Sequence, residues 1–160
     1  MPADSDRRFL MPSLLDRLSG NVDNPAGADL TQSVAQLRRS VRHDVENLLN
    51  TRWRCSHWPP DLSQLDHSLV TYGIPDFSGA AFGSPDHREA LRLAIERALE
   101  MYEPRFARVR VVLVDTRRND RTLRFRIEGE LRAYPNPEPV VFDSQVDTVS
   151  NHIRVQRSNA

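Results

Sequence analysis

The apolar residues between positions 31 and 49 recur with a helical period. They are separated by three or four positions each: Val34, Leu37, Val41, Val45 and Leu48. This spacing places them on one stripe of an α-helix, which predicts a helix whose apolar face is turned inward. The polar residues of the opposite face are expected to be solvated or in contact with a partner, and they include Gln36, Arg39, Arg42, Asp44 and Glu46.

A second helix is predicted from about Pro85 to Tyr102. Ser84 suits the N-cap, Pro85 the first helical position and Asp86 the first turn, where an acidic residue favours the helix dipole. The apolar residues that follow have helical spacing: Leu91, Ala94, Ile95, Ala98 and Tyr102. Pro104 prevents the helix from continuing, because proline lacks the N–H group that a helical hydrogen bond requires.

After Pro104 the hydrophobic period changes to two, which is typical of strands with one polar face. Apolar residues alternate with polar ones in two segments, at Val109, Val111 and Leu113, and at Leu123, Phe125, Ile127 and Leu131. The polar segment 116–120 is prone to turns, so the two segments predict an antiparallel hairpin. Residues 140–146 predict a third strand, and the tail from Ser150 onward either adds a short edge strand or stays mobile.

The N-terminal segment has its own short apolar pattern. Ser13 is a candidate N-cap, after which Leu14, Leu15 and Leu18 share a helical face. Residues 21–28 are rich in Asn, Asp, Pro and Gly, which favour turns and bury little. We therefore expect a short apolar helix and a flexible linker over residues 1–28, followed by a single domain over residues 29–160.

The remaining segments read as loops. Trp53 and Trp58 precede a pair of prolines and suit either an interface or a cap on the core. Residues 68–77 have short extended character that is broken by glycine and proline. The whole pattern predicts an α+β fold, with two main helices and a short N-terminal helix packed on a three- to four-stranded, mainly antiparallel sheet.

Composition narrows the class of protein. The 22 acidic residues balance the 22 basic ones, so no global field draws the chain to nucleic acid or to an anionic membrane. Cys55 is the only cysteine, which excludes an intrachain disulfide and a thiolate metal cage. No export signal or apolar run of membrane-spanning length is visible. We expect a soluble, cytoplasmic protein.

An ordered set of short motifs carries a family resemblance over roughly residues 10 to 147. The motifs are Leu14-Leu15-Asp16-Arg17-Leu18, Ser40-Val41-Arg42, Leu48-Leu49-Asn50-Thr51-Arg52, Ser68-Leu69, Tyr72-Gly73-Ile74-Pro75-Asp76 and Tyr102-Glu103-Pro104-Arg105. In this order and spacing the chain resembles the TssE baseplate subunits of type VI secretion systems. These form a lysozyme-like baseplate family that is similar to a wedge protein of contractile phage tails.

The resemblance implies a structural function rather than an enzymatic one. It implies a scaffold that joins the baseplate wedge to the contractile sheath and helps to start sheath polymerisation. The implied partners are the wedge subunits TssF, TssG and TssK, the sheath subunits TssB and TssC, and the spike hub, with no cofactor. The location implied is the baseplate at the inner face of the cytoplasmic membrane. Addition of a strand to an unpaired sheet edge is one physical route for the sheath contact.

The resemblance also implies that the N-terminal helix of residues 1–28 is a docking helix for neighbouring wedge subunits. The interface residues that it implies are Leu14, Leu15, Arg17, Leu18, Asn50, Thr51, Arg52, Glu103, Pro104 and Arg105. Each has a simpler interpretation from the residues alone. The leucines suit the chain's own core, the Asn-Thr-Arg segment suits a helix C-terminus, and Glu103 and Arg105 suit two solvated charges beside a helix terminator. Pairing of Glu103 and Arg105 with charges on another subunit is the alternative.

Four other functions receive little support. A peptidoglycan hydrolase would need two carboxylates across a cleft, with candidates at Glu46, Glu103, Glu128 and Glu130. Metal binding lacks a ligand motif, because the five histidines are scattered along the chain. Cys55 and His57 could suggest a nucleophile and its base, but no third group is evident that would orient them. Nucleic-acid binding through the arginine-bearing face of residues 108–132 is opposed by the interleaved acidic residues.

Overall fold

The computed structural model describes residues 18, 34–54, 59, 61–62, 64–65, 68–77, 84–114, 122–133, 136–147 and 150–158. The predicted docking helix and linker of residues 1–28 lie outside these residues, apart from Leu18, whose side chain is 74% exposed. Cys55, His57 and Trp58 also lie outside them.

The two main helices are confirmed. Helix α3 spans Val34–Asn50 and helix α4 spans Pro85–Tyr102. Both bury most of the predicted apolar stripe; Val34 of the α3 stripe is 37% exposed, and Ala94 and Tyr102 of the α4 stripe are partly buried. Ser84 occupies the N-cap of α4, although its side chain makes no capping hydrogen bond. Among the described helices, none combines the length and the apolar character needed to cross a membrane.

Four antiparallel strands form one sheet in the order β1-β2-β3-β4. Strand β1 spans Phe106–Val114, β2 spans Thr122–Leu131, β3 spans Glu138–Asp147 and β4 spans Ile153–Arg157. The chain is therefore α+β, as predicted, and the tail supplies the fourth strand. Register follows the hydrophobic alternation, so that Val111 lies opposite Ile127 and Ile127 lies opposite Phe142.

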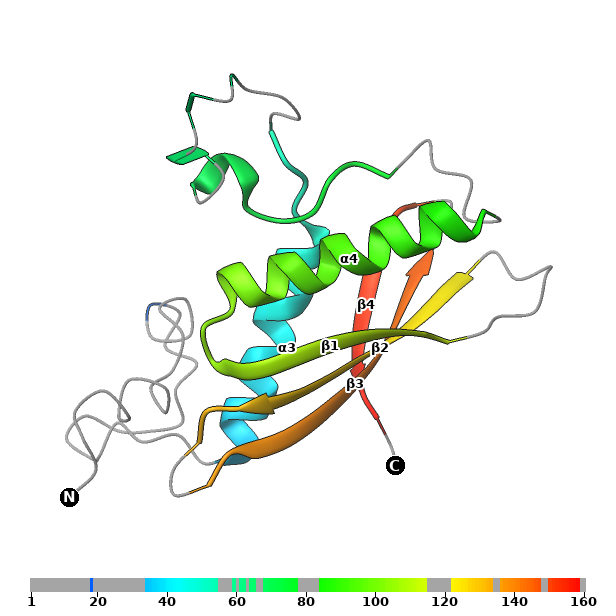
Figure 1. Ribbon diagram of the computed structural model, residues 1–160. Helices are drawn as coiled ribbons and strands as arrows, with labels where there is room; N and C mark the ends of the chain where they lie inside the picture. Colours follow the sequence, from blue (N-terminus) through cyan, green and yellow to red (C-terminus); the bar gives the residue numbers. More distant parts are fainter. Residues whose placement is uncertain are drawn as a thin grey trace.

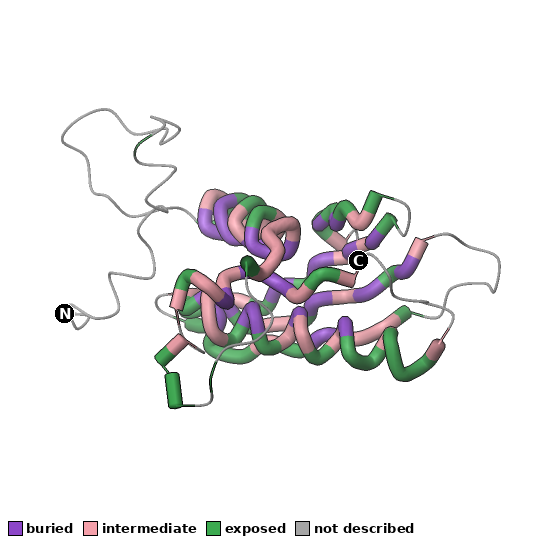
Figure 2. The backbone as a smooth tube through the Cα atoms, turned by 90° about the horizontal axis from the view of Figure 1, so that it is seen from above, coloured by how far each residue is buried: buried purple, intermediate pink, exposed green. Residues whose placement is uncertain are grey.

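Both helices pack against the apolar face of the sheet. Helix α4 runs alongside β1, whereas α3 contacts β4 and β3 (Figure 1). Buried and exposed positions alternate along the strands, and the tube view shows this mixture along helices and strands alike (Figure 2). Burial of the Leu, Ile and Phe side chains at the centre contributes about 1.5–3 kcal/mol each relative to exposure. The opposite face of the sheet carries the charged residues of the predicted polar face.

The segment before α4 departs from the expected extended conformation. Leu69–Thr71 form a short 3-10 helix, η3, because the Ser68 side chain accepts a hydrogen bond from the Val70 N–H at 3.2 Å. Gly73 then adopts a φ of 102°, and Ile74 forms an isolated parallel bridge with Arg52. A Cβ at Gly73 would lie 2.2 Å from the Thr51 carbonyl oxygen, so the close approach of these two segments requires glycine.

Candidate protein-interaction site

The Glu103-Pro104-Arg105 triplet forms the turn from α4 into β1. The Glu103 N–H donates to the Leu99 carbonyl at 3.0 Å, which ends the helix. The Phe106 N–H then donates to the Glu103 carbonyl at 3.2 Å. This closes a four-residue turn with Pro104 in its second position, which proline favours because its φ is fixed. The triplet therefore sets the direction in which the sheet begins.

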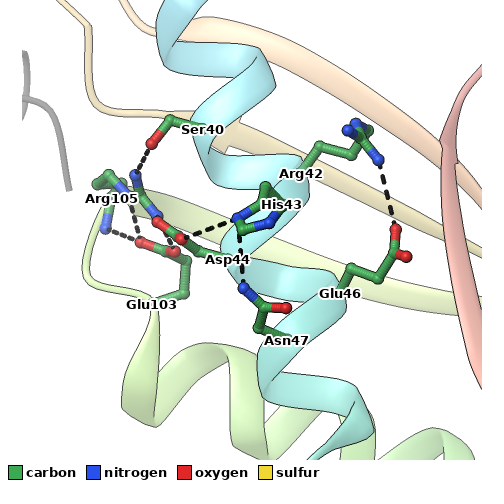
Figure 3. Close-up of polar contacts among 8 residues, drawn as sticks. All are labelled: Ser40, Arg42, His43, Asp44, Glu46, Asn47, Glu103 and Arg105. Carbon is green, nitrogen blue, oxygen red and sulfur yellow. Dashed lines mark hydrogen bonds and ion pairs between the residues drawn. The ribbon is translucent and has the colours of Figure 1, made fainter. Parts of the chain in front are cut away.

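The two charged side chains of the triplet bind each other. Glu103 Oε1 accepts from Arg105 Nε at 2.6 Å and from the Arg105 main-chain N–H at 3.2 Å. Its second oxygen, Oε2, pairs with Arg105 Nη2 (Figure 3). This two-point contact between a carboxylate and a guanidinium group fixes the side chains as a unit, because the planar fork of arginine matches the carboxylate.

The same guanidinium group reaches across to α3. Arg105 Nη1 donates to Ser40 Oγ at 3.1 Å, and Nη2 pairs with Asp44 Oδ2 at 2.6 Å. Ser40 and Asp44 lie four residues apart on α3, so they face the same direction from neighbouring turns. Arg105 therefore connects the corner between α4 and β1 to α3. We call Ser40, Asp44, Glu103 and Arg105 the corner cluster.

The corner cluster is buried, which overturns the interpretation of two solvated charges. Glu103 is 5% exposed, and the Arg105 side chain is 12% exposed. Burial lowers the pKa of Arg105, but the hydrogen bond and charge of Glu103, together with Asp44, raise it overall. Burial raises the pKa of the neighbouring Tyr72, and the negative charges of Asp44 and Glu103 raise it further.

The Asn50-Thr51-Arg52 segment ends α3 and attaches it to β4. Asn50 Nδ2 donates to the carbonyls of Glu46 and Ile153, at 2.8 Å each. Arg52 donates to the Leu49 carbonyl at 2.8 Å and to the Asn151 carbonyl at 2.6 Å. The interpretation of this segment as a helix C-terminus is confirmed. Burial lowers the pKa of Arg52, and Asp76 raises it in opposition.

The outer strand β4 is covered by side chains of α3. The Ile153 N–H donates to Asn50 Oδ1 at 2.9 Å, so the Asn50 amide satisfies both main-chain groups of Ile153. The Val155 N–H donates to Glu46 Oε2 at 3.3 Å, and Arg42 Nη1 donates to the Val155 carbonyl at 3.2 Å. Arg42 and Glu46 also pair with each other (Figure 3).

The outer strand β1 is covered in the same way by α4. The Val111 N–H donates to Glu96 Oε2 at 2.8 Å, and Arg92 Nη1 donates to the Val111 carbonyl at 3.5 Å. Arg92 and Glu96 pair with each other at 3.0 Å and, like Arg42 and Glu46, lie four residues apart on their helix. Each edge of the sheet thus meets an Arg-Glu pair that supplies one donor and one acceptor. We call these two pairs the edge caps.

The edge caps change the expected route of partner binding. An unpaired strand edge invites another strand because its N–H and C=O groups seek partners. At Val111, Ile153 and Val155 those groups are already bonded to helix side chains. The expectation of an unpaired edge is therefore wrong at these three residues. An incoming strand would have to displace an edge cap at Val111 or Val155, or the Asn50 amide at Ile153.

A second expectation concerns the polar side of the first helix, which is predicted to be solvated or to face a partner. It is wrong for Asp44, Arg42 and Glu46, because these side chains contact Arg105 or β4 of the same chain. The sequence does hold a signal for the edge caps, since Arg42-Glu46 and Arg92-Glu96 share a spacing of four residues. That spacing alone is also common in solvated helices, so it does not identify a sheet contact.

The comparison with known families decides the class of this chain. Residues 35–136, more than half of the sequence, match the family model described as Baseplate wedge protein gp25. The chain belongs to this family. No curated protein and no solved structure matches the chain. The matched range runs from α3 past the end of β2, so it contains the whole corner cluster and both Arg-Glu pairs.

Membership of the baseplate wedge family makes this chain a structural protein of a phage-tail-like baseplate. Its candidate interface residues are distributed unevenly. The structure brings Glu103 and Arg105 together and leaves Pro104 exposed at the tip of the turn. Asn50 and Arg52 lie at the end of α3 and hydrogen-bond to the carbonyls of Ile153 and Asn151, at the start of β4 and just before it. Leu14, Leu15 and Arg17 lie outside the described residues.

The carboxylates considered for hydrolysis do not share a cleft in this baseplate wedge protein. Glu103 is engaged by Arg105, and Glu46 covers β4. Glu128 and Glu130 are exposed on the open face of β2, where they lie opposite Arg110 and Arg108. Among the described residues, no group of three His, Cys, Asp or Glu side chains is arranged to hold a metal ion.

Proposed function

We propose that this chain is the baseplate subunit of a type VI secretion system that joins the wedge to the contractile sheath and helps to initiate sheath polymerisation. The observation that carries the proposal is the family match over residues 35–136, together with the ordered TssE-like motifs inside that range. Both point to contractile baseplates, and the motifs favour the secretion system over a phage tail.

A rigid corner suits a scaffold that transmits force between neighbours. Arg105 holds α3, α4 and β1 together through three side chains, so the exposed Pro104 is presented from a fixed frame. We assign the wedge contact to this corner and to the N-terminal segment. The residues that we propose for the protein interface are Leu14, Leu15, Arg17, Leu18, Asn50, Thr51, Arg52, Glu103, Pro104 and Arg105.

The implied partners are the wedge subunits TssF, TssG and TssK, the sheath subunits TssB and TssC, and the spike hub. The proposed location is the cytoplasmic baseplate at the inner face of the cytoplasmic membrane. We assign the sheath contact to the sheet, through strand addition beyond the capped residues or after an edge cap is displaced. We propose no enzymatic activity, because the buried Glu103 is neutralised by Arg105 rather than directed into a cleft.

Co-purification with wedge and sheath proteins encoded in the same gene cluster tests this proposal. Alongside the wild type, a Leu14→Asp and Leu18→Asp double variant removes the proposed N-terminal contact. We expect it to lose wedge subunits and to retain its melting temperature, because the Leu18 side chain is already 74% exposed. Leu93→Asp is the matched control, since Leu93 is an exposed leucine on α4 with 51% of its surface accessible.

The outcomes separate the parts of the proposal. Loss of the wedge subunits in the double variant, with full retention in Leu93→Asp, supports the N-terminal contact. Retention of wedge subunits but no sheath subunits by the wild type would remove the sheath-joining role. If the wild type captures neither set, the secretion-system assignment fails, although membership of the baseplate family does not depend on this result.

A further inference from the structure

A groove of about 700 Å³ lies between α3 and the starting half of β3. Its apolar lining, which we call the floor, includes Val34 and Val141, which are 37% and 36% exposed, beside the buried Val140 and Phe142. Its lining also carries four arginines, which we call the rim: Arg38, Arg39, Arg42 and Arg157. This volume lies within the range of about 300–1,000 Å³ that is typical of ligand pockets. We call it the α3–β3 groove. It shares no residue with the corner cluster.

Two of the four arginines are already engaged. Arg38 pairs with Glu138 at the start of β3, and Arg42 pairs with Glu46 while it covers the Val155 carbonyl. Arg39 and Arg157 are both exposed, and among the described residues neither has a carboxylate partner. Arg39 lies on α3 and Arg157 on β4, and both line the groove because the fold brings these two elements together.

We propose that the α3–β3 groove binds an acidic peptide segment of a partner protein, with carboxylates on Arg39 and Arg157 and apolar side chains on the floor. Charge complementarity argues for this occupant, because none of the described residues that line the groove is a carboxylate that could balance the guanidinium groups of Arg39 and Arg157. Arginine forks bind carboxylates through two parallel hydrogen bonds, which adds direction to the attraction.

The apolar floor favours a peptide over a nucleic acid. A single-stranded nucleic acid binds through aromatic surfaces on which its bases stack, and Phe142, the one aromatic residue among the described lining residues, is 3% exposed. The overall charge of the chain is zero, so nothing beyond the groove reinforces binding to a polyanion. A peptide that alternates acidic and apolar residues would match both the rim and the floor.

Fluorescence anisotropy with the full chain tests the proposal. The probe is a labelled eight-residue peptide of alternating Glu and Val, and its matched control carries Gln in place of Glu. We expect binding of the Glu peptide alone, weakened by added salt because exposed charges are screened. Arg39→Glu with Arg157→Glu should weaken binding by about tenfold or more, since 1.4 kcal/mol corresponds to a factor of ten.

Arg97→Glu with Arg110→Glu is the control double variant, because it makes the same change in net charge at two exposed arginines outside the groove. It should change the affinity by less than about twofold. Equal weakening by both double variants would overturn the proposal, because the attraction would then be a property of net charge. Arg39→Gln with Arg157→Gln, which avoids new acidic groups, should give an intermediate loss if the variant proteins stay folded.

Two further probes distinguish other occupants. A labelled oligothymidylate and vesicles that contain phosphatidylglycerol are presented to the same proteins. If either binds as tightly as the Glu peptide and loses affinity in the groove variant, the groove recognises polyanions in general, and the assignment to an acidic peptide is wrong. If the Glu peptide does not bind at all, the proposal is also overturned. None of these results bears on the co-purification experiment.

Discussion

Two ion pairs of the same chemistry occupy very different places in this protein. In the corner cluster, Arg105 and Glu103 have side chains that are 12% and 6% exposed. On the open face of the sheet, Arg126 Nε pairs with Asp143 Oδ1 at 2.8 Å, and these side chains are 43% and 44% exposed. Arg105 of the first pair also binds Asp44 and so joins α3 to the corner between α4 and β1, whereas the second pair joins two strands that the sheet already holds together. We therefore expect the two pairs to differ in their contribution to the free energy of unfolding because of burial and connectivity, and not because of their distances.

Arg105→Ala should have the largest effect on stability. It leaves the buried Glu103 carboxylate without its counter-charge, and breaking one partner of a buried pair typically costs about 3–5 kcal/mol. We expect that loss in the free energy of unfolding, measured by urea denaturation. Arg105→Lys should recover only part of it, because a single ammonium group cannot reach Ser40, Asp44 and Glu103 in the geometry of the guanidinium fork. Full recovery by lysine would mean that charge alone suffices.

Asn50→Leu should have the next largest effect. The change keeps the size of the side chain but removes both bonds to Ile153 at the edge of β4. Each buried group left without a partner costs about 1–3 kcal/mol. Asn47→Leu is the control, since Asn47 is an exposed asparagine of the same helix whose side-chain amide hydrogen-bonds to the exposed His43 of that helix and not to β4. Equal unfolding midpoints for the two variants would show that the cap on Ile153 contributes nothing.

Arg126→Ala should leave the urea midpoint unchanged within error. The pair with Asp143 lies on the exposed sheet face, where solvent competes for both groups and many such pairs contribute nothing measurable. The prediction sharpens the comparison with Arg105, because both variants delete one arginine, from two buried ion pairs at Arg105 and from one exposed pair at Arg126. A loss as large as that of Arg105→Ala would show that the open face is covered in the folded protein.

A further effect is expected at alkaline pH. The pKa of Tyr72 is raised in the folded chain by burial and by Asp44 and Glu103, so the folded state holds this proton more tightly than the unfolded state. The stability that results is fully present below the unfolded pKa of about 10 and is lost as the pH rises through the folded pKa. Tyr72→Phe should therefore make the alkaline loss of stability less steep. Asp44→Asn should lower the Tyr72 pKa, which tyrosinate absorbance measures against Tyr72→Phe.

Hydrophobic periodicity was sufficient to predict the main elements of the fold. The stripes of α3 and α4 and the alternation of β1 and β2 reflect burial on one face, which each segment encodes for itself. The same reasoning misplaced Leu69–Thr71, because a local bond to Ser68 outweighed the extended preference of Leu and Val. The family motifs correctly directed attention to Glu103 and Arg105 but not to their neighbours.

The contacts of the candidate site were harder to predict, because they depend on which elements meet. Asp44 and Arg42 look alike in the sequence, as polar positions on one amphipathic helix. In the fold they diverge, since Asp44 meets the corner after α4 while Arg42 meets a strand more than 100 residues later. No local pattern encodes a partner that is so distant along the chain.

During synthesis of the chain, each edge cap is made before the strand that it covers. Helix α4 precedes β1, and helix α3 precedes β4, so each cap-bearing helix leaves the ribosome before the strand that it covers. Strand edges exposed during folding are the surfaces at which nascent chains aggregate. Each of the two outer strands therefore emerges when the side chains that will cover it are already available. A circular permutant that begins at residue 106 would make β1 before α4, and should aggregate more during translation than during refolding of the completed chain.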